Sequence, residues 1–344
     1  MAVADNPENK TVYAANQKAN TVSVIDATAC NKDHLAGCNQ TWPTINVGNV
    51  PRFIGINKVT STIYVSNNGD NTLSVIDGAT CNRKRTSGCR QSQPTTPVGN
   101  FPQQVTVDER TNTIYVVNRV DNTVSVINGD VCNAGNISGC YQSWPTVTVG
   151  VSPQALAVNP NNHTVYVANT DDNTVSVFSA LHCNATDSSG CEQAPATIPV
   201  GAGPRSVGIV FDTHTVFVGN RDDLTVSVID GSTCNGTDTT GCGQTPPAVL
   251  LGAFPHTGGN VKNLLGRSIA IKNHIIYIPN IGDSDVATLD GNTCRAGHVD
   301  GCDVKIVQKR MGGFPVTATV DEESETVYVA NDTDGTVSVF PSSR

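Results

Sequence analysis

The sequence predicts an all-β protein, a seven-bladed β-propeller of four-stranded antiparallel blades whose last blade shows only three strands. The first observation behind this prediction is a recurring hexapeptide with an aromatic residue, spaced by 51 residues in five intervals and by 60 in one. The aromatic positions are Tyr13, Tyr64, Tyr115, Tyr166, Phe217, Tyr277 and Tyr328. The second observation is that six cysteine pairs follow the same spacing. A fixed period of this length indicates copies of one supersecondary unit.

A single unit is clearest at residues 153–200, where four short runs rich in Val, Ile, Thr and Tyr alternate with Asn-, Asp-, Gly- and Pro-rich turns. Such runs are typical of strands joined by tight turns. The runs are PQALAV (strand a), HTVYVAN (strand b), TVSVFS (strand c) and, after a polar cysteine-containing loop, PATIPV (strand d). No window shows the apolar spacing of a helix. We therefore expect four strands per blade and almost no helix.

The repeat also predicts one domain over residues 1–344, although the length alone allows up to three. We expect blades at about residues 1–48, 49–99, 100–150, 151–201, 202–252, 253–312 and 313–344. Residues 2–13 align on 155–166, so strand a of blade 1 opens the sequence, and TVSVFPSSR closes it as strand c of blade 7. The alternatives for blade 7 are a shortened chain end and a true three-stranded blade. Small residues at the middle of strand a, such as Gly55 and Ala157, suit blades that converge on an axis.

Composition excludes two classes of function. The formal net charge of −9 argues against nucleic-acid binding, which needs a basic surface. No apolar run is long enough for a transmembrane helix. We expect a monomer whose partner is a small molecule, a glycan or a protein.

The hexapeptides carry a resemblance to a known family. Tyr166-Val167-Ala168-Asn169 and Tyr328-Val329-Ala330-Asn331, each followed by a segment like Thr-Val-Ser-Val, resemble the YVTN repeat family of seven-bladed β-propellers. The resemblance covers essentially the whole chain and implies a surface-layer or secreted protein. Related propeller families include lactonases and a lyase. The six cysteine pairs are a departure from the family pattern.

Each cysteine pair closes a nine-residue ring in the loop between strands c and d. The pairs are Cys30 with Cys38, Cys81 with Cys89, Cys132 with Cys140, Cys183 with Cys191, Cys234 with Cys242, and Cys294 with Cys302. Pairs on separate blades cannot supply four ligands to one zinc ion, so we predict disulfides. Disulfides indicate an oxidising location. We therefore expect a secreted, periplasmic or cell-surface protein, although the printed sequence shows no signal peptide.

Candidate ligand-binding residues follow the proline that opens strand a in four blades, and Arg267-Ser268-Ile269 of blade 6 matches Arg205-Ser206-Val207. In five blades this position, at the mouth of the propeller axis, is Arg or Gln: Arg52, Gln103, Gln154, Arg205 and Arg267. Three guanidinium groups around one mouth would attract a carboxylate or phosphate. The alternative is that they pair with aspartates of neighbouring turns between strands b and c.

The single long interval marks a second candidate. An 11-residue insertion, residues 256–266, precedes strand a of blade 6 on the same face and contains His256, Lys262 and Asn263. We predict a lid or catalytic loop in which His256 acts as general base or metal ligand, with a tolerated surface loop as the alternative. The Asn that ends every hexapeptide raises a further option, a Ca²⁺ or Mg²⁺ ion on the axis. Repetition in all seven blades favours a structural role for this Asn instead.

Two functions remain open from the sequence. The favoured one is a secreted or surface module that binds a ligand or partner at the axial mouth. The alternative is a hydrolase of lactones, esters or phosphoesters, or a lyase, with a divalent metal as an option. No nucleophile elbow, zinc-protease sequence or phosphate loop occurs in the sequence.

Overall fold

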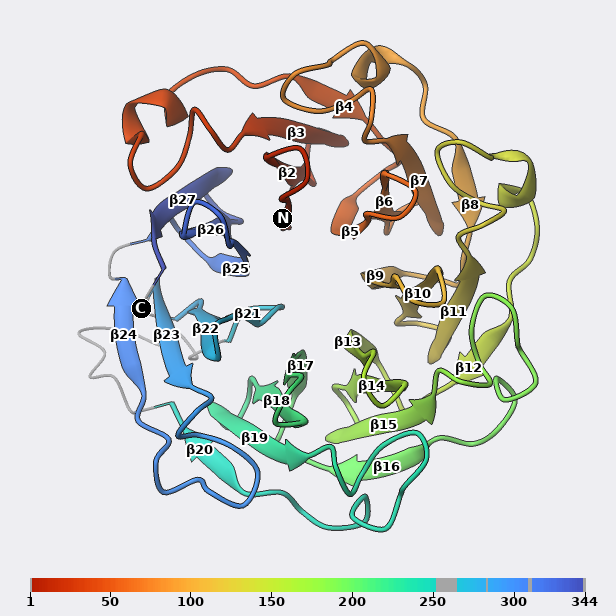
Figure 1. Cartoon of the computed structure of the whole chain (residues 1–344), viewed down its shortest axis with the longest axis vertical. Coiled ribbons are helices and arrows are strands. Elements are labelled where there is room, and N and C mark those ends of the chain that lie inside the picture. Colours follow the sequence, from red (N-terminus) through yellow and green to blue (C-terminus); the bar gives the residue numbers. More distant parts are fainter. Residues whose placement is uncertain (1, 252–264, 283, 309–310, 343–344) are drawn as a thin grey trace.

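The computed structural model describes residues 2–251, 265–282, 284–308 and 311–342, which form seven antiparallel sheets arranged radially around an axis (Figure 1). Each sheet runs outward from strand a. The innermost strands are β1 (Val3–Asn6), β5 (Pro51–Asn57), β9 (Pro102–Asp108), β13 (Pro153–Asn159), β17 (Pro204–Val210), β21 (Ala270–Lys272) and β25 (Pro315–Asp321). The second strands are β2 (Thr11–Asn16), β6 (Thr62–Asn67), β10 (Thr113–Asn118), β14 (Thr164–Asn169), β18 (Thr215–Asn220), β22 (Ile275–Asn280) and β26 (Thr326–Asn331).

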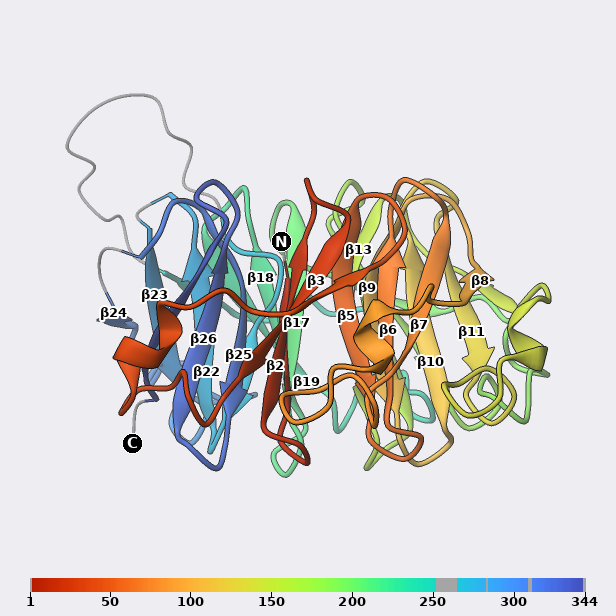
Figure 2. The same cartoon turned by 90° about the horizontal axis from the view of Figure 1, so that it is seen from above.

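The two outer rings complete the blades. The third strands are β3 (Thr21–Asp26), β7 (Thr72–Asp77), β11 (Thr123–Asn128), β15 (Thr174–Ser179), β19 (Thr225–Asp230), β23 (Asp285–Asp290) and β27 (Thr336–Pro341). The outermost strands are β4 (Thr44–Asn46), β8 (Thr95–Pro97), β12 (Thr146–Thr148), β16 (Ala196–Pro199), β20 (Ala248–Leu250) and β24 (Lys305–Gln308). The predicted fold class is confirmed: six blades have four strands and the last, β25-β26-β27, has three. Seen from the side, the molecule is a short cylinder with turns on its two faces (Figure 2).

The inner strands carry small residues because neighbouring blades converge there. A Cβ atom added to Gly55 would lie 2.8 Å from Val105 Cγ1 of the next blade, and one added to Gly208 would lie 2.8 Å from Ile269 Cγ2. Farther out, β-branched residues of adjacent sheets interdigitate, and the hexapeptide aromatic is fully buried in all seven blades. The low aromatic content therefore reflects sheets that pack on both faces.

The repeated Asn and Asp side chains bind the turns of the mouth face, as the structural interpretation predicts. The Asn67 amide donates to Thr72 Oγ1 at 3.1 Å and to Ser74 Oγ at 2.9 Å, and five other blades repeat this pair of bonds. The Asp70 carboxylate accepts the backbone N–H of Asn49 at 2.6 Å. Asp121, Asp172, Asp223 and Asp334 accept the corresponding N–H groups in their blades. These bonds join each turn between strands d and a to the following turn between strands b and c.

All six predicted disulfides are present, with Cα–Cα distances from 4.4 to 4.8 Å. The described residues contain no free cysteine. In the chain-entropy model, a nine-residue ring stabilises the folded state by about 2.6 kcal/mol. The only described helices are single turns within these loops, η1 (Leu35–Cys38), η2 (Gly88–Arg90) and η3 (Ser138–Cys140). None of them approaches the length required to cross a bilayer.

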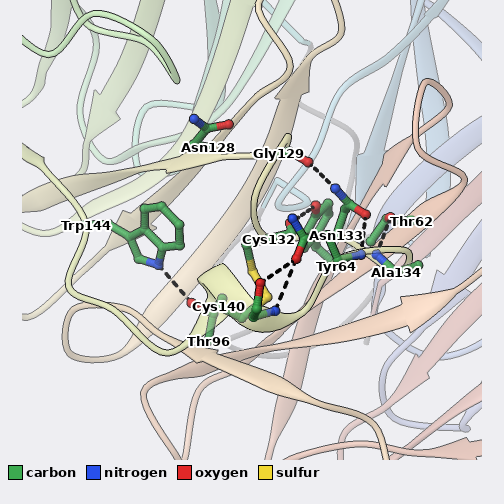
Figure 3. Close-up of a disulfide and its surroundings, with 12 residues drawn as sticks. Thr62, Tyr64, Thr96, Asn128, Gly129, Cys132, Asn133, Ala134, Cys140 and Trp144 are labelled. Carbon is green, nitrogen blue, oxygen red and sulfur yellow. Dashed lines mark hydrogen bonds between the residues drawn. A yellow bond between two sulfur atoms is a disulfide. The ribbon is translucent and has the colours of Figure 1, made fainter.

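The cysteine loops also connect neighbouring blades. The hydroxyl of Tyr64 donates to the carbonyl of Cys132 in the next blade at 2.6 Å, and the N–H of Ala134 donates to Thr62 Oγ1 at 2.9 Å (Figure 3). The same tyrosine bond recurs in other blades: Tyr13 to Cys81, Tyr115 to Cys183, Tyr166 to Cys234, and Tyr328 to Cys30. Phe217 stands at the equivalent position between blades 5 and 6 and has no hydroxyl to donate.

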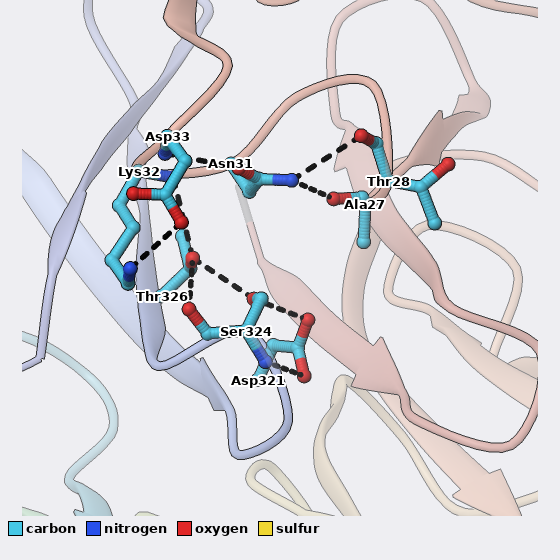
Figure 4. A network of polar contacts seen from close by, with 8 residues as sticks. All are labelled: Ala27, Thr28, Asn31, Lys32, Asp33, Asp321, Ser324 and Thr326. Atoms are coloured by element: carbon cyan, nitrogen blue, oxygen red, sulfur yellow. Dashed lines mark hydrogen bonds and ion pairs between the residues drawn. The ribbon is translucent and has the colours of Figure 1, made fainter.

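Blade 7 is joined to blade 1 without a covalent turn between them in the described residues. Tyr328 donates to the Cys30 carbonyl at 2.7 Å, and the N–H of Val3 donates to Thr317 Oγ1 at 3.1 Å. Lys32 N–H donates to Thr326 Oγ1 at 3.3 Å within a network of loop residues from both blades (Figure 4). The ring is therefore closed by the same contacts that connect the other blades.

The tyrosine bond makes a testable prediction. Replacing Tyr115 by Phe removes a buried donor and leaves the Cys183 carbonyl without it, so the free energy of unfolding should fall by about 1 to 2 kcal/mol. The matched control is Tyr141→Phe, because this side chain is 69% exposed and should lose little. Denaturant titration of the two variants measures the difference, and equal stabilities would contradict a structural role for the bond.

Candidate functional site

The predicted ligand-binding residues lie at equivalent positions around the axis, at the beginning of strand a. Arg52, Gln103, Gln154 and Arg205 are each the second residue of β5, β9, β13 and β17, and Arg267 lies three residues before β21. Because each inner strand starts at the mouth face, these side chains form one ring, here called the mouth ring. The three arginines are half-buried, whereas Gln103 and Gln154 are buried, at 0% and 4% exposed. The arginines are therefore the members accessible to a ligand.

A second set of residues surrounds the mouth ring and was not predicted from the sequence. It occupies the position after the hexapeptide Asn, where the turn between strands b and c begins. The residues are Gln17, Asn68, Arg119, Thr170, Arg221, Ile281 and Asp332, different in nearly every blade. This variability within a regular repeat was the available signal, since repeated positions serve the fold and varied ones are free to serve a site.

The arginines act on one another electrostatically. Burial and the nearby charges of Arg267 and Arg119 lower the pKa of Arg52 to about 10, although Asp332 acts in the opposite direction. Burial and four neighbouring guanidinium groups likewise lower the pKa of Arg205 to about 10. Burial also lowers the pKa of Arg267. All three groups remain cationic at neutral pH, so the mouth concentrates positive charge.

Hydrogen bonds within the protein satisfy these arginines only in part. The Nε atoms of Arg52, Arg205 and Arg267 are buried and have no hydrogen-bond partner in the described part of the protein. Arg52 Nη1 donates to Gln17 Oε1 at 3.3 Å. Buried guanidinium donors without partners are costly to keep in a folded protein. An anion in the mouth would supply the missing acceptors.

Aspartates near the mouth compensate part of this charge. Burial opposes ionisation of Asp332, but nearby positive charges, of which Arg267 and Arg52 make the smaller contributions, lower its pKa. Arg221 Nε lies 2.6 Å from Asp222 Oδ1 of its own turn. Asp332 therefore acts on Arg52 and Arg267 through its charge, and the alternative that mouth arginines pair with turn aspartates stays open for these residues. Arg119, also beside the mouth, donates its Nε–H to Ser152 Oγ at 2.8 Å.

The remaining sequence candidates cannot be placed. His256, Lys262 and Asn263 lie outside the described residues, so the predicted lid and general base stay predictions. The last two residues of the insertion are described. Leu265 is buried at 1% exposed, and the N–H of Gly266 donates to the Pro279 carbonyl at 2.7 Å. These contacts attach the end of the insertion to β22, next to Arg267 of the mouth ring.

A divalent cation has few ready ligands in the part of the chain that is described. No group of three or more His, Cys, Asp and Glu side chains comes together there. The hexapeptide Asn amides donate to Thr and Ser hydroxyls of strand c, and in five blades their buried Oδ1 atoms have no hydrogen-bond partner among the described residues. The mouth, with five arginines that Asp332 and Asp222 compensate only in part, suits an anion better than a metal ion.

The charge arrangement predicts a stability effect. Arg205 is cationic both folded and unfolded at pH 7, and its lowered pKa means that the folded state disfavours that charge. Arg205→Gln, which copies the natural residue of blades 3 and 4, should raise the free energy of unfolding by about 1 to 2 kcal/mol.

Because the charge penalty persists at every pH below about 10, the gain should be the same from pH 6 to pH 8. The control is Arg85→Gln on an exposed cysteine loop, which should change stability by less than about 0.5 kcal/mol. Thermal or denaturant unfolding of both variants tests this. A loss of stability in Arg205→Gln would mean that the guanidinium supports the fold.

Comparison with known proteins agrees with the architecture. No curated protein gives a significant match to the chain. Among solved structures, hydrazine synthase of Kuenenia stuttgartiensis superposes with a TM-score of 0.71 at 16% identity, covering 99% of this chain and 95% of that one. U3-55K and the WD40 repeats of RRP9 each superpose with a TM-score of 0.68 at 11% identity, covering 99% of this chain and 94% and 93% of theirs. At these identities the likeness concerns the fold alone.

A family model provides the closer assignment. The model described as "Lactonase, 7-bladed beta-propeller" matches residues 2–186, more than half of the chain, and the matched segment includes Arg52, Gln103, Gln154 and Arg119. With its seven radial sheets and a cationic axial mouth, the chain belongs to the seven-bladed β-propeller lactonase family.

Proposed function

We propose that this protein binds a small molecule carrying a carboxylate or phosphate group at the axial mouth. The observation that carries the proposal is the set of three half-buried arginines, Arg52, Arg205 and Arg267, whose Nε atoms have no partner in the described structure. A guanidinium group presents a planar fork of donors that matches both anions. The bound anion would complete the hydrogen bonding and offset the mutual repulsion that lowers the arginine pKa values.

The charge distribution of the whole chain supports selective uptake. The formal net charge is −9, yet five arginines lie at or beside the mouth. A local positive field on an acidic protein steers small anions to one place while the remaining surface repels them. Such a surface also disfavours nucleic acid, whose long polyanion would meet the acidic surroundings.

The wider setting that we propose follows from the disulfides and the repeat. We propose that residues 1–344 form one domain, that the protein is a monomer, and that it acts as a secreted or cell-surface propeller of the YVTN type. The six disulfides support an oxidising location, because such bonds persist outside the reducing cytosol.

Calorimetric titration with inorganic phosphate and with citrate tests the binding proposal. Arg205→Gln should weaken binding by about tenfold, the effect of one charge-assisted hydrogen-bond donor. Raising the ionic strength from low to physiological salt should weaken binding further, because charge attraction is screened. Arg85→Gln is the control and should bind like the parent. Absence of binding at millimolar concentrations, or equal affinities in both variants, would contradict the proposal.

A second candidate function, hydrolysis of an anionic lactone or related ester, is favoured by the family and by one carboxylate near the mouth. The pKa of Asp332 is lowered, in part by the charges of Arg267 and Arg52, so this side chain is ionised. In this mechanism the arginines would hold the anionic substrate and stabilise the oxyanion that forms at the carbonyl carbon. Asp332 would orient the attacking water and accept its proton. Phosphoester cleavage, a lyase reaction and use of a divalent metal are variants of the same candidate.

Turnover assays distinguish this candidate from binding alone. Lactones with and without a carboxylate or phosphate group should be offered to the parent, to Asp332→Asn and to His256→Ala, with and without EDTA. If the mouth is catalytic, Asp332→Asn should lower kcat by about a hundredfold or more.

Anion binding by calorimetry should survive in Asp332→Asn, since removing a negative charge beside the arginines favours an anion. Parent-level turnover in both variants would remove Asp332 and His256 from the mechanism. No turnover on any of these substrates would leave binding as the function.

A further inference from the structure

One of the six cysteine loops differs from the other five in its charge. In blade 2 the seven residues between the two cysteines are NRKRTSG, and Arg83, Lys84 and Arg85 give them a formal charge of +3. The corresponding segments of the other loops carry 0 or −1, with histidine counted as neutral. The whole chain has a net charge of −9, so composition does not explain three adjacent cations. A position that varies within a regular repeat is free to serve a function.

The fold holds the backbone of this loop at a fixed position. The disulfide of blade 2 closes the ring. Inside the ring the side-chain amide of Asn82 donates to the Gly78 carbonyl at 2.8 Å. Its oxygen accepts the N–H groups of Lys84 and Arg85 at 2.9 and 3.1 Å. The Asn82 N–H also donates to the Arg85 carbonyl at 2.7 Å. A ligand would therefore bind without first having to order this turn.

The protein neutralises these three cations to different extents. The Arg83 guanidinium is half-buried, with its Nε donating to the Asn9 carbonyl at 3.0 Å and its Nη1 3.8 Å from Asp26 Oδ2. Arg83 therefore joins blade 2 to blade 1. Lys84 and Arg85 are exposed, and neither side chain has an ion pair or a hydrogen bond within the described ranges. These two cations are available to a partner.

The three cations line one depression of about 410 Å³. It lies between the cysteine loop of blade 2 and the turns that join strands a and b in blades 1 and 2, so it is on the face opposite the mouth. The other residues that line it have polar or small side chains, among them Glu8, Lys10 and Ser61. Lys10 is already paired with Glu323 at 2.6 Å. The depression thus offers hydrogen-bonding groups and two unpaired cations, with no large apolar side chain.

This lining distinguishes between classes of anionic partner. Proteins and peptides anchor mainly through aromatic or aliphatic side chains in apolar pockets, which this depression does not provide. The Glu8 carboxylate repels an acidic peptide, but it can accept hydrogen bonds from sugar hydroxyls. A long polyanion would extend over the acidic remainder of the surface. The chemistry that fits the depression best is a short sugar chain with anionic groups.

We propose that the turn at Lys84 and Arg85, with the adjacent depression, binds the end of an anionic glycan, a few sugar units that carry sulfate or uronate groups. Two anionic groups would contact Lys84 and Arg85 together, and sugar hydroxyls would bond to the polar lining. The site is separate from the axial mouth and does not depend on the function proposed there.

Binding at this turn requires several simultaneous contacts. An exposed ion pair contributes at most about 1 kcal/mol, so a single phosphate or citrate ion gains little from Lys84 and Arg85. A glycan combines two such pairs with hydrogen bonds in one ligand. Arg85→Gln should therefore still bind phosphate and citrate at the mouth like the parent, while it loses affinity for the glycan.

Calorimetric titration at physiological salt tests the site with four probes of similar length. They are maltotetraose, sulfated maltotetraose, tetragalacturonate and tetraglutamate. The parent should bind at least one of the two anionic sugars with a Kd below about 1 mM, and the neutral sugar and the peptide about tenfold more weakly or less. Tighter binding of sulfated maltotetraose would assign the site to sulfate groups, and tighter binding of tetragalacturonate would assign it to carboxylates.

Variants locate the binding. Lys84→Gln combined with Arg85→Gln removes both unpaired cations and should weaken binding of the anionic sugars by about tenfold. The matched control is Lys32→Gln combined with Arg295→Gln, which removes two cations from other cysteine loops and gives the same net charge. This control should bind like the parent, and so should Arg205→Gln of the mouth ring. Thermal unfolding verifies that every variant is folded.

Four results would overturn the proposal. One is the absence of binding of either anionic sugar at millimolar concentration. Another is an equal loss of affinity, or none, in the two double variants, which would leave no role for the turn in blade 2. A loss of binding in Arg205→Gln but not in the variant of Lys84 and Arg85 would place the sugars in the mouth. Tetraglutamate that binds as tightly as the anionic sugars would assign the turn to an acidic peptide.

Discussion

The fold depends on a hydrogen bond that crosses from one blade to the next at five of the seven blade junctions in the described structure. A buried tyrosine hydroxyl donates to the carbonyl of the first cysteine in the following blade, and that cysteine is held in place by its own nine-residue ring. A sheet packed face to face on another sheet can slide, because apolar contacts have little directional preference. At these junctions the hydroxyl removes that freedom, because the bond fixes the position of one blade relative to the next. The disulfide makes the acceptor rigid, so the two features act as one device.

Because these bonds align the blades elsewhere, the residues of the mouth are not needed for that purpose. The cysteine loops align the blades away from the mouth. At the turns of the mouth face, repeated Asn and Asp side chains align them. The residues between these two sets, at the beginning of strand a and after the hexapeptide Asn, can vary without loss of the fold. Five arginines collect there, three with buried donors that the protein leaves unpartnered in its described part. A site can carry such destabilising groups only on a scaffold that is stable without them.

The regular parts of the molecule were predictable because they are local. Strand order, tight turns and disulfides depend on residues within one 51-residue unit, and periodicity reveals them directly. The bond from Tyr64 to the Cys132 carbonyl was not predictable, because its partners are 68 residues apart and meet only after the sheets stack. The sequence predicts which residues form the mouth ring. It does not predict the burial of Gln103 or the effect of the Arg119 charge on the pKa of Arg205, because both depend on the curvature of the closed ring. Arg119, Arg221 and Asp332 were missed, although the variation at their position within a regular repeat was a signal in the sequence.

The short span of each cysteine ring has a consequence for how the protein is made. Twelve cysteines admit a very large number of pairings, and most of them would link different blades and trap misfolded chains. Here each correct partner is eight residues away, so it is met by a loop closure that is far faster than the docking of blades. Every unit can therefore oxidise correctly as soon as its own residues have emerged during synthesis, before the next unit exists. Correct disulfide pairing therefore depends on the short spacing within each unit and does not require the folded propeller.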